Sequence, residues 1–218
     1  MKYKHVIWDW NGTLLDDVAL GHRMLNYLQS IKGIEPSSFE DYREMFTFPI
    51  TDFYKKAGLF ENMESFQKLA DIYIKEYESK VGDCFLQDGA EEVLDRFEKS
   101  GITSSILTAS LESMARSQIK HYGIEKYFIA VTGKDDYYAS GKCELVLTHL
   151  SKIKYSPEEI VFVGDTLHDA EIAKEIECDC ILVQNGHQYI EKLDQIDIST
   201  AKDLREVYVK VLNTAKKG

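Results

Sequence analysis

Residues 5–16 read HVIWDWNGTLLD. The first part of this stretch, residues 5–10, is apolar, β-branched and aromatic except at Asp9, which is typical of a buried strand. Asn11-Gly12 ends the run, and this dipeptide alone would also fit a two-residue hairpin. No second strand follows it, however, because apolar residues then recur at helical spacing. The stretch therefore predicts a strand that places Asp9 near its carboxyl end.

Residues 16–85 show helical patterns without an intervening strand. We expect helices at about 16–31, 38–46, 51–57 and 63–81. Pro49 and Gly58 separate consecutive segments, as expected for residues that break helices. These residues thus predict a small helical unit inserted after the first strand.

After Gly82 the pattern changes to alternating strands and helices. Strands are expected at 104–108, 127–132, 160–163 and 179–183, and helices at 91–100, 113–122, 144–153, 169–176 and 200–212. Such alternation is typical of a parallel sheet built from right-handed βαβ units. We predict an α/β fold: a Rossmann-like, doubly wound parallel sheet formed by residues 1–15 and 86–218, with residues 16–85 as an inserted helical cap.

The composition excludes several protein classes. The 218 residues are 44% hydrophobic and 29% charged, which argues against a disordered or collagen-like chain. The net charge of −11 argues against a nucleic-acid partner, and no apolar run predicts a signal peptide or a membrane span. The four cysteines lack zinc-ligand spacing, which favours reduced thiols. We therefore expect a cytoplasmic protein.

Polar side chains follow successive predicted strands. Asp9, Thr108 and Asp165 each end a strand, Lys142 follows another, and Asp169 lies in the helix after Asp165. Ligands of open parallel sheets bind at these carboxyl ends. Facing carboxylates repel each other unless a cation lies between them, and oxygen ligands suit Mg²⁺. A carboxylate beside a bound phosphoryl group can attack phosphorus, which predicts covalent catalysis.

This order of motifs resembles the haloacid dehalogenase superfamily of hydrolases, in particular its phosphoglycolate-phosphatase-like branch with an inserted helical cap. The motifs are DWNGT at 9–13, the strand ending in Thr108, Lys142, and Val-Gly-Asp at 163–165 followed by Asp169. Further similarity lies at 14–16, 88–89 and 185–187, so the resemblance covers nearly the whole chain. Each motif alone is weakly specific, but their order at successive strand ends is strongly specific.

The resemblance implies roles for the acidic residues. Asp9 corresponds to the nucleophile that forms an aspartyl phosphate, and Asp9 and Asp165 correspond to carboxylate ligands of Mg²⁺. Asn11 corresponds to a residue whose backbone carbonyl binds the ion, and Asp169 to one that holds a water of the ion. The implied activity is hydrolysis of a small phosphorylated metabolite, by a monomer or small homo-oligomer.

The resemblance also implies a phosphate-binding set. Thr108, Lys142 and the backbone N–H groups of Gly12 and Ala109 correspond to groups that bind the phosphoryl oxygens, and Lys142 is also counted as catalytic. The helical cap corresponds to a unit that closes over the site and excludes water. A plain surface position remains the alternative for Lys142.

Asn11 departs from the family pattern, because phosphatases of this family usually carry an aspartate there as general acid and base. An amide cannot transfer the proton, and losing a positioned acid typically costs about 10²–10⁴-fold in rate. Three interpretations stay open: a slow phosphatase, a proton supplied by another residue or by the substrate, or a catalytically weak protein that binds a phosphorylated ligand.

Other polar residues have simpler interpretations. His168 and His187 could replace the missing acid, but we expect both at the surface, and we expect Arg43 to be solvated rather than bound to a substrate carboxylate. Residues 46–49 are the best candidates for a loop that determines substrate specificity.

Overall fold

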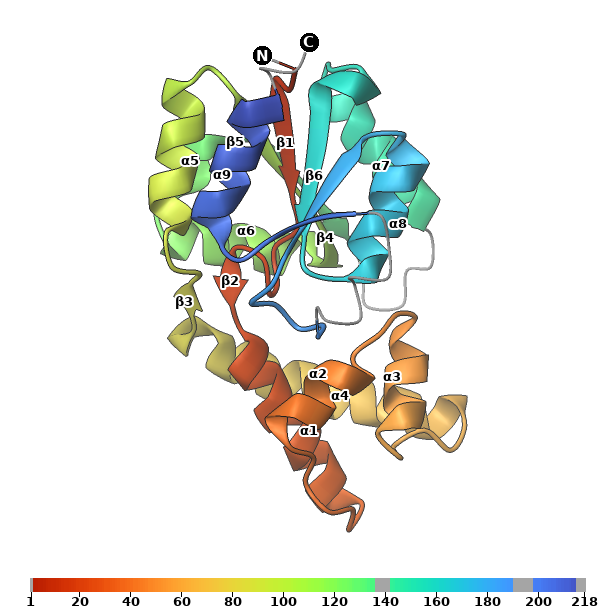
Figure 1. The fold of residues 1–218 in the computed structure, drawn as a ribbon. Helices are drawn as coiled ribbons and strands as arrows, with labels where there is room; N and C mark the ends of the chain where they lie inside the picture. Colours follow the sequence, from red (N-terminus) through yellow and green to blue (C-terminus); the bar gives the residue numbers. More distant parts are fainter. Residues whose placement is uncertain (1, 136–141, 190–197, 215–218) are drawn as a thin grey trace.

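A six-stranded parallel sheet, in the order β5-β4-β1-β6-β7-β8, lies in the larger part of the molecule, apart from the helices α1 to α4 (Figure 1). The computed structural model describes residues 2–135, 142–189 and 198–214, without the side chains of 142–144. The strands are β1 (His5–Trp8), β4 (Thr103–Leu111), β5 (Phe128–Lys134), β6 (Ile160–Gly164), β7 (Asp179–Val183) and β8 (Ser199–Ala201). The predicted α/β class is confirmed.

Strand β1 lies in the middle of the sheet and pairs on both sides. Ile7 lies opposite Ser105 of β4 and Phe162 of β6. All four residues of β1 are buried, as expected for a parallel strand covered on both faces. Because side chains alternate along a strand, Val6 and Trp8 belong to the core on one face while Ile7 belongs to the core on the other.

Helices cover both faces of the sheet, so the fold is doubly wound (Figure 1). The core beneath α5 (Ala90–Lys99), α6 (Glu112–His121) and α9 (Leu204–Asn213) is separate from the core beneath α7 (Lys142–Lys152) and α8 (Leu167–Ile176). Apolar residues at helical spacing, such as Val93 and Phe97 of α5, supply the first core.

The helices α1 (Val18–Ile31), α2 (Phe39–Met45), α3 (Ile50–Lys56) and α4 (Met63–Lys80) form a separate group (Figure 1). They enclose their own apolar cluster, which includes Leu25, Tyr42 and Phe53. Two short antiparallel strands, β2 (Leu15–Asp16) and β3 (Phe85–Leu86), join this group to the sheet. None of the described helices is long and apolar enough to cross a membrane.

Two features differ from the sequence-based expectation. The segment expected as a helix from residue 200 begins instead with strand β8, which pairs with the edge of β7, and its helix begins at Leu204. The pair β2–β3 was not predicted, because two-residue strands have no measurable periodicity. Both differences arise from tertiary pairing, which a local pattern does not encode.

Two buried histidines connect β1, β4 and α7. His5 Nε2 and His149 Nε2 lie 2.7 and 2.8 Å from the Ser105 hydroxyl, and His149 Nδ1 lies 2.9 Å from Thr132 Oγ1. Burial lowers the pKa of His5 to about 3 and that of His149 to about 4. Both imidazoles are therefore neutral in the native state near neutral pH.

Stability is expected to decline in acid because of these histidines. In the unfolded chain they bind protons below about pH 6.5, while the native state does not, so protonation favours unfolding. Each histidine then removes up to about 1.4 kcal/mol of unfolding free energy per pH unit between about pH 6.5 and its native pKa. Urea unfolding of the wild type and of His149→Gln at pH 4.5–7.5 checks this. An equally steep pH dependence in both proteins would contradict it.

Candidate active site

Three carboxylates meet at the carboxyl end of the sheet. Asp9 follows β1, Asp165 follows the neighbouring β6, and Asp169 lies in the first turn of α8; one oxygen from each lies within 4.8 Å of the others. Asp165 and Asp169 are buried and Asp9 is half-buried. Hard oxygen ligands in such a cluster can hold a divalent cation such as Mg²⁺.

Burial and mutual repulsion destabilise the charged form of these acids. Burial, then the charges of Asp169 and Asp165, raise the pKa of Asp9. Burial also raises the pKa of Asp165, with Asp169 adding to the effect and His187 opposing it. A bound cation would remove this repulsion, so the donor set fits a divalent metal.

The loops around Asp165 pack unusually close to it. Its Oδ1 accepts a hydrogen bond from Thr13 Oγ1 at 3.1 Å, and its Oδ2 accepts one from the His187 backbone N–H at 2.6 Å. A Cβ atom at Gly12 would lie 2.4 Å from Asp165 Oδ2, and one at Gly186 would lie 2.1 Å from Asp165 Cβ. Glycine at both positions is therefore a condition for this geometry.

Asp169 also has a local structural role. Its Oδ2 accepts hydrogen bonds from the backbone N–H groups of Asp165 (3.1 Å) and Thr166 (2.9 Å) and from the Thr166 hydroxyl (2.7 Å). These contacts form a capping box at the start of α8. The carboxylate is thus fixed beside Asp165 by the helix terminus.

The predicted phosphate-binding residues are only partly brought together. Thr108 and Ala109 line the same cavity as Asp9; they lie near the carboxyl end of β4, which continues to Leu111 rather than ending at Thr108 as expected. The Gly12 N–H already donates to Leu15 O and to Asp17 Oδ1, at 3.0 and 2.8 Å. Its role in binding phosphate stays a prediction, since that N–H would have to exchange partners.

The lysine expected at the phosphate cannot be placed. Helix α7 begins at Lys142, but the side chain of this residue lies outside the described part of the structure. A second lysine, Lys134 at the end of β5, lines the cavity. Sequence reasoning missed it, although its position at a strand end was a usable signal.

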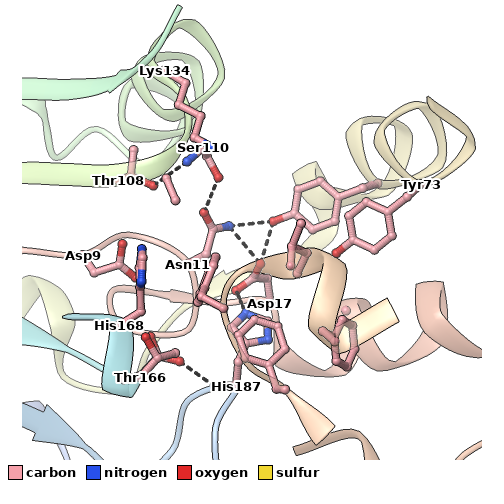
Figure 2. A pocket seen from close by; sticks show the side chains of 18 of the residues that line it. Asp9, Asn11, Asp17, Tyr73, Thr108, Ser110, Lys134, Thr166, His168 and His187 are labelled. Atoms are coloured by element: carbon pink, nitrogen blue, oxygen red, sulfur yellow. Dashed lines mark hydrogen bonds and ion pairs between the residues drawn. The ribbon is translucent and has the colours of Figure 1, made fainter. Parts of the chain in front are cut away.

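The Asn11 side chain is held on both sides of its amide (Figure 2). Its Nδ2 donates to Asp17 Oδ2 at 2.9 Å and to the Tyr77 hydroxyl at 2.8 Å, and its Oδ1 accepts from Ser110 Oγ at 2.7 Å. Tyr77 in turn donates to Asp17 Oδ2 at 2.6 Å. The amide is therefore a bridge between the sheet and α4.

Asp17 is the centre of this network and is only 2% exposed. Besides its contacts with Asn11, Tyr77 and Gly12, its Oδ1 lies within hydrogen-bond distance of His187 Nε2, at 3.2 Å. Although burial opposes the effect, His187 and the hydrogen bonds lower the pKa of Asp17. A buried carboxylate is thus kept charged by four donors.

His187 is not at the surface, and that expectation was wrong. Its side chain is buried, stacks on Phe46 with 4.8 Å between ring centroids, and places Nδ1 2.7 Å from the Tyr42 hydroxyl.

His168 is half-buried and lines the cavity. Arg43 is not solvated as expected either, because its Nη2 donates to the backbone carbonyls of Gln184 and Gln188.

Residues 6–183 match the model of the family described as haloacid dehalogenase-like hydrolase. The chain belongs to the haloacid dehalogenase-like hydrolase family. The family and the hydrolase class inferred from the four motifs are thus confirmed.

Relatives within the family carry different activities in their names. The chain is 25% identical over 213 residues to tyrosine-protein kinase PtkA of Mycobacterium tuberculosis, covering 93% of this chain and 70% of that protein. It is 24% identical over 187 residues to a phosphoglycolate phosphatase of Agrobacterium fabrum, covering 83% and 80%. A predicted phosphatase from Clostridium acetobutylicum has the same fold, with a TM-score of 0.84, 18% identity, and coverage of 98% and 100%.

In this haloacid dehalogenase-like hydrolase, the hydrogen-bond network around Asn11 could be identified only from the folded structure. Asp17, Tyr77 and Ser110 come from three distant segments, and no motif marks them. Asp17 alone offered a signal, as a second acid directly after the first motif. The predicted functions of the site residues themselves stay predictions.

The amide at position 11 is expected to be required for stability. Asn11→Asp would place a second carboxylate about 2.9 Å from Asp17 Oδ2, which costs about 1–3 kcal/mol of unfolding free energy at neutral pH. The double variant Asn11→Asp/Asp17→Asn should recover most of the loss, because one acid and one amide again face each other.

Urea unfolding of the wild type, both single variants and the double variant measures the coupling energy, expected at about 0.5–3 kcal/mol. Additive losses would show that residues 11 and 17 do not interact in solution.

Proposed function

We propose that the protein is a Mg²⁺-dependent phosphatase that hydrolyses a small phosphorylated metabolite through a phosphoaspartate at Asp9. The observation that carries this proposal is the cluster of Asp9, Asp165 and Asp169 in a cavity that Thr108 also lines. The name of the Agrobacterium relative, phosphoglycolate phosphatase, supports the same reaction class. Three further statements remain predictions: the protein is cytoplasmic, it has no nucleic-acid or membrane partner, and it is a monomer or small homo-oligomer.

The groups proposed to hold Mg²⁺ are the carboxylates of Asp9, Asp165 and Asp169 and the backbone carbonyl of Asn11. The ion, when bound, would neutralise charge on the carboxylates and on the phosphoryl oxygens. Asp9 has a role of its own: its carboxylate attacks phosphorus while the bond to the leaving oxygen breaks. Thr108, Lys142, and the N–H groups of Gly12 and Ala109 are proposed to orient the phosphoryl group.

Hydrolysis of the phosphoaspartate completes the reaction. Water attacks phosphorus, the bond to the Asp9 oxygen breaks, and both hydrogens of the water leave with phosphate. Asn11 does not assist as a base, because its amide cannot accept the proton and its oxygen already accepts from Ser110. The second step is therefore expected to be slow compared with that of family members with an acid at this position.

Removing the nucleophile tests the proposal. Asp9→Asn keeps the shape of the side chain, and is expected to lower hydrolysis of 4-nitrophenyl phosphate by about 10³-fold or more. The matched control is Asp88→Asn, since Asp88 is an exposed carboxylate paired with Arg205, and it should keep wild-type activity. Chelation of Mg²⁺ should stop the wild-type reaction.

Phosphate binding without any metal-dependent turnover would instead favour the second candidate, a catalytically weak protein that binds a phosphorylated ligand. The observation in favour of that candidate is the Asn11 amide, which is hydrogen-bonded to Asp17 and Ser110 and cannot transfer a proton.

Turnover should depend on the leaving group, because Asn11 cannot supply its proton. Acetyl phosphate, which releases a weakly basic acetate, is expected to be cleaved at least about 10²-fold faster than glycerol phosphate, which releases an alkoxide. The double variant Asn11→Asp/Asp17→Asn should narrow this ratio by restoring an acid. Equal rates on both substrates in the wild type would mean that another group donates the proton.

A further inference from the structure

We propose that the natural substrate is an aryl phosphate, whose uncharged aromatic ring occupies the cavity between the carboxylates and helix α4. The inference rests on the phosphatase function proposed above and names its substrate class. The cavity has a volume of about 300 Å³, at the lower end of the range for small-molecule sites. It extends from Asp9 and Thr108 to residues of α4.

Helix α4 presents an apolar row to this cavity. Phe66, Ala70 and Ile74 recur every fourth residue and so share one face of the helix, with Tyr73 and Tyr77 beside them. All except Tyr77 are only half-buried, although Phe66 and Tyr73 also pack against the apolar cluster of the helical group, in which Leu69 is buried. An apolar group in the cavity would remove this row from water, which is favourable.

Aromatic rings from the loop after α2 form another wall. Phe48 stacks on His168 with 4.3 Å between ring centroids and 20° between planes, and Phe46 stacks on His187 in the same way at 4.8 Å and 20°. These contacts fix the rings of both phenylalanines at the cavity. Fixed aromatic walls favour an aromatic guest, which can meet them in offset or edge-to-face contact.

A charged leaving group would lack a partner on this side. Among the described residues that line the cavity, those from the helical segment 18–85 are glycine, alanine, isoleucine, phenylalanine or tyrosine. Arg43, the basic residue considered for a substrate carboxylate, is bound to the Gln184 and Gln188 carbonyls. Lys134, His168 and His187, which also line the cavity, lie outside this segment. Burying a carboxylate against the helical segment without a counter-charge would cost free energy.

The chemistry at Asn11 agrees with the same substrate class. When Asp9 attacks phosphorus, the bond between phosphorus and the aryl oxygen breaks and the phenoxide leaves with the electron pair. It then takes a proton from solvent. A phenol has a pKa of about 10, far below that of an alcohol, so the phenoxide leaves without the acid that Asn11 cannot provide. The pocket and position 11 are separate observations that select the same leaving group.

Binding of phosphonates tests ring recognition without chemistry. With Mg²⁺ present, phenylphosphonate is expected to bind at least tenfold more tightly than phosphonoacetate, and more tightly than cyclohexylphosphonate, by calorimetry. Equal or tighter binding of phosphonoacetate or of cyclohexylphosphonate would overturn the aryl assignment. Inorganic phosphate serves as the reference: failure of phosphate itself to bind with Mg²⁺ would count against the proposed function and therefore against the aryl substrate as well.

A variant that fills the cavity locates the ring. Ala70→Phe adds a ring in the middle of the row on α4, and should lower kcat/KM for phenyl phosphate by about tenfold or more. The same variant should change kcat/KM for acetyl phosphate less than threefold. Lys75→Ala, at an exposed position of α4, is the control for effects on the helix. An equal loss for both substrates would overturn the placement of the ring, while the wild-type phosphonate comparison remains decisive if Ala70→Phe does not fold.

Discussion

The mutual repulsion of three carboxylates, buried Asp165 and Asp169 and half-buried Asp9, is the constraint around which the carboxyl end of the sheet is built. Like charges in a low-dielectric site are costly unless donors or a cation compensate. The protein supplies some compensation itself, through Thr13 and the His187 backbone on Asp165, and through Thr166 on Asp169. Asp9, which is half-buried and lines the cavity, is the most exposed of the three.

A second buried charge connects the sheet to the helical segment. Asp17 follows the short strand β2 and accepts hydrogen bonds from Gly12, Asn11 and Tyr77 of α4. The ring of His187 contacts Asp17 (Figure 2). The backbone N–H of His187 donates to Asp165, so the two acidic centres share a residue. The position of α4 over the cavity is thereby linked electrostatically to the site.

The asparagine at position 11 belongs to this connection as much as to the catalytic motif. Its amide nitrogen donates hydrogen bonds to Asp17 and Tyr77, and its amide oxygen accepts one from Ser110. An aspartate in the same place would have no proton for Asp17 at neutral pH. The departure from the family pattern is therefore compensated by local hydrogen bonds. The names of the relatives, a kinase and a phosphatase, fit a fold on which local residues rather than topology select the reaction.

Sequence patterns alone predicted the α/β class, five of the six strands of the sheet with the helices between them, and the family. They could do so because periodicity and the residues that end strands are local properties. The sequence also indicated Asp9, Asp165 and Asp169 as candidate metal ligands, since the carboxyl ends of neighbouring parallel strands meet at one edge of the sheet. The partners of Asn11, the burial of His187, the pairing of β8 and the aromatic walls of the cavity were visible only in the folded structure. These depend on contacts between segments far apart in the chain, whose free energies no local pattern records.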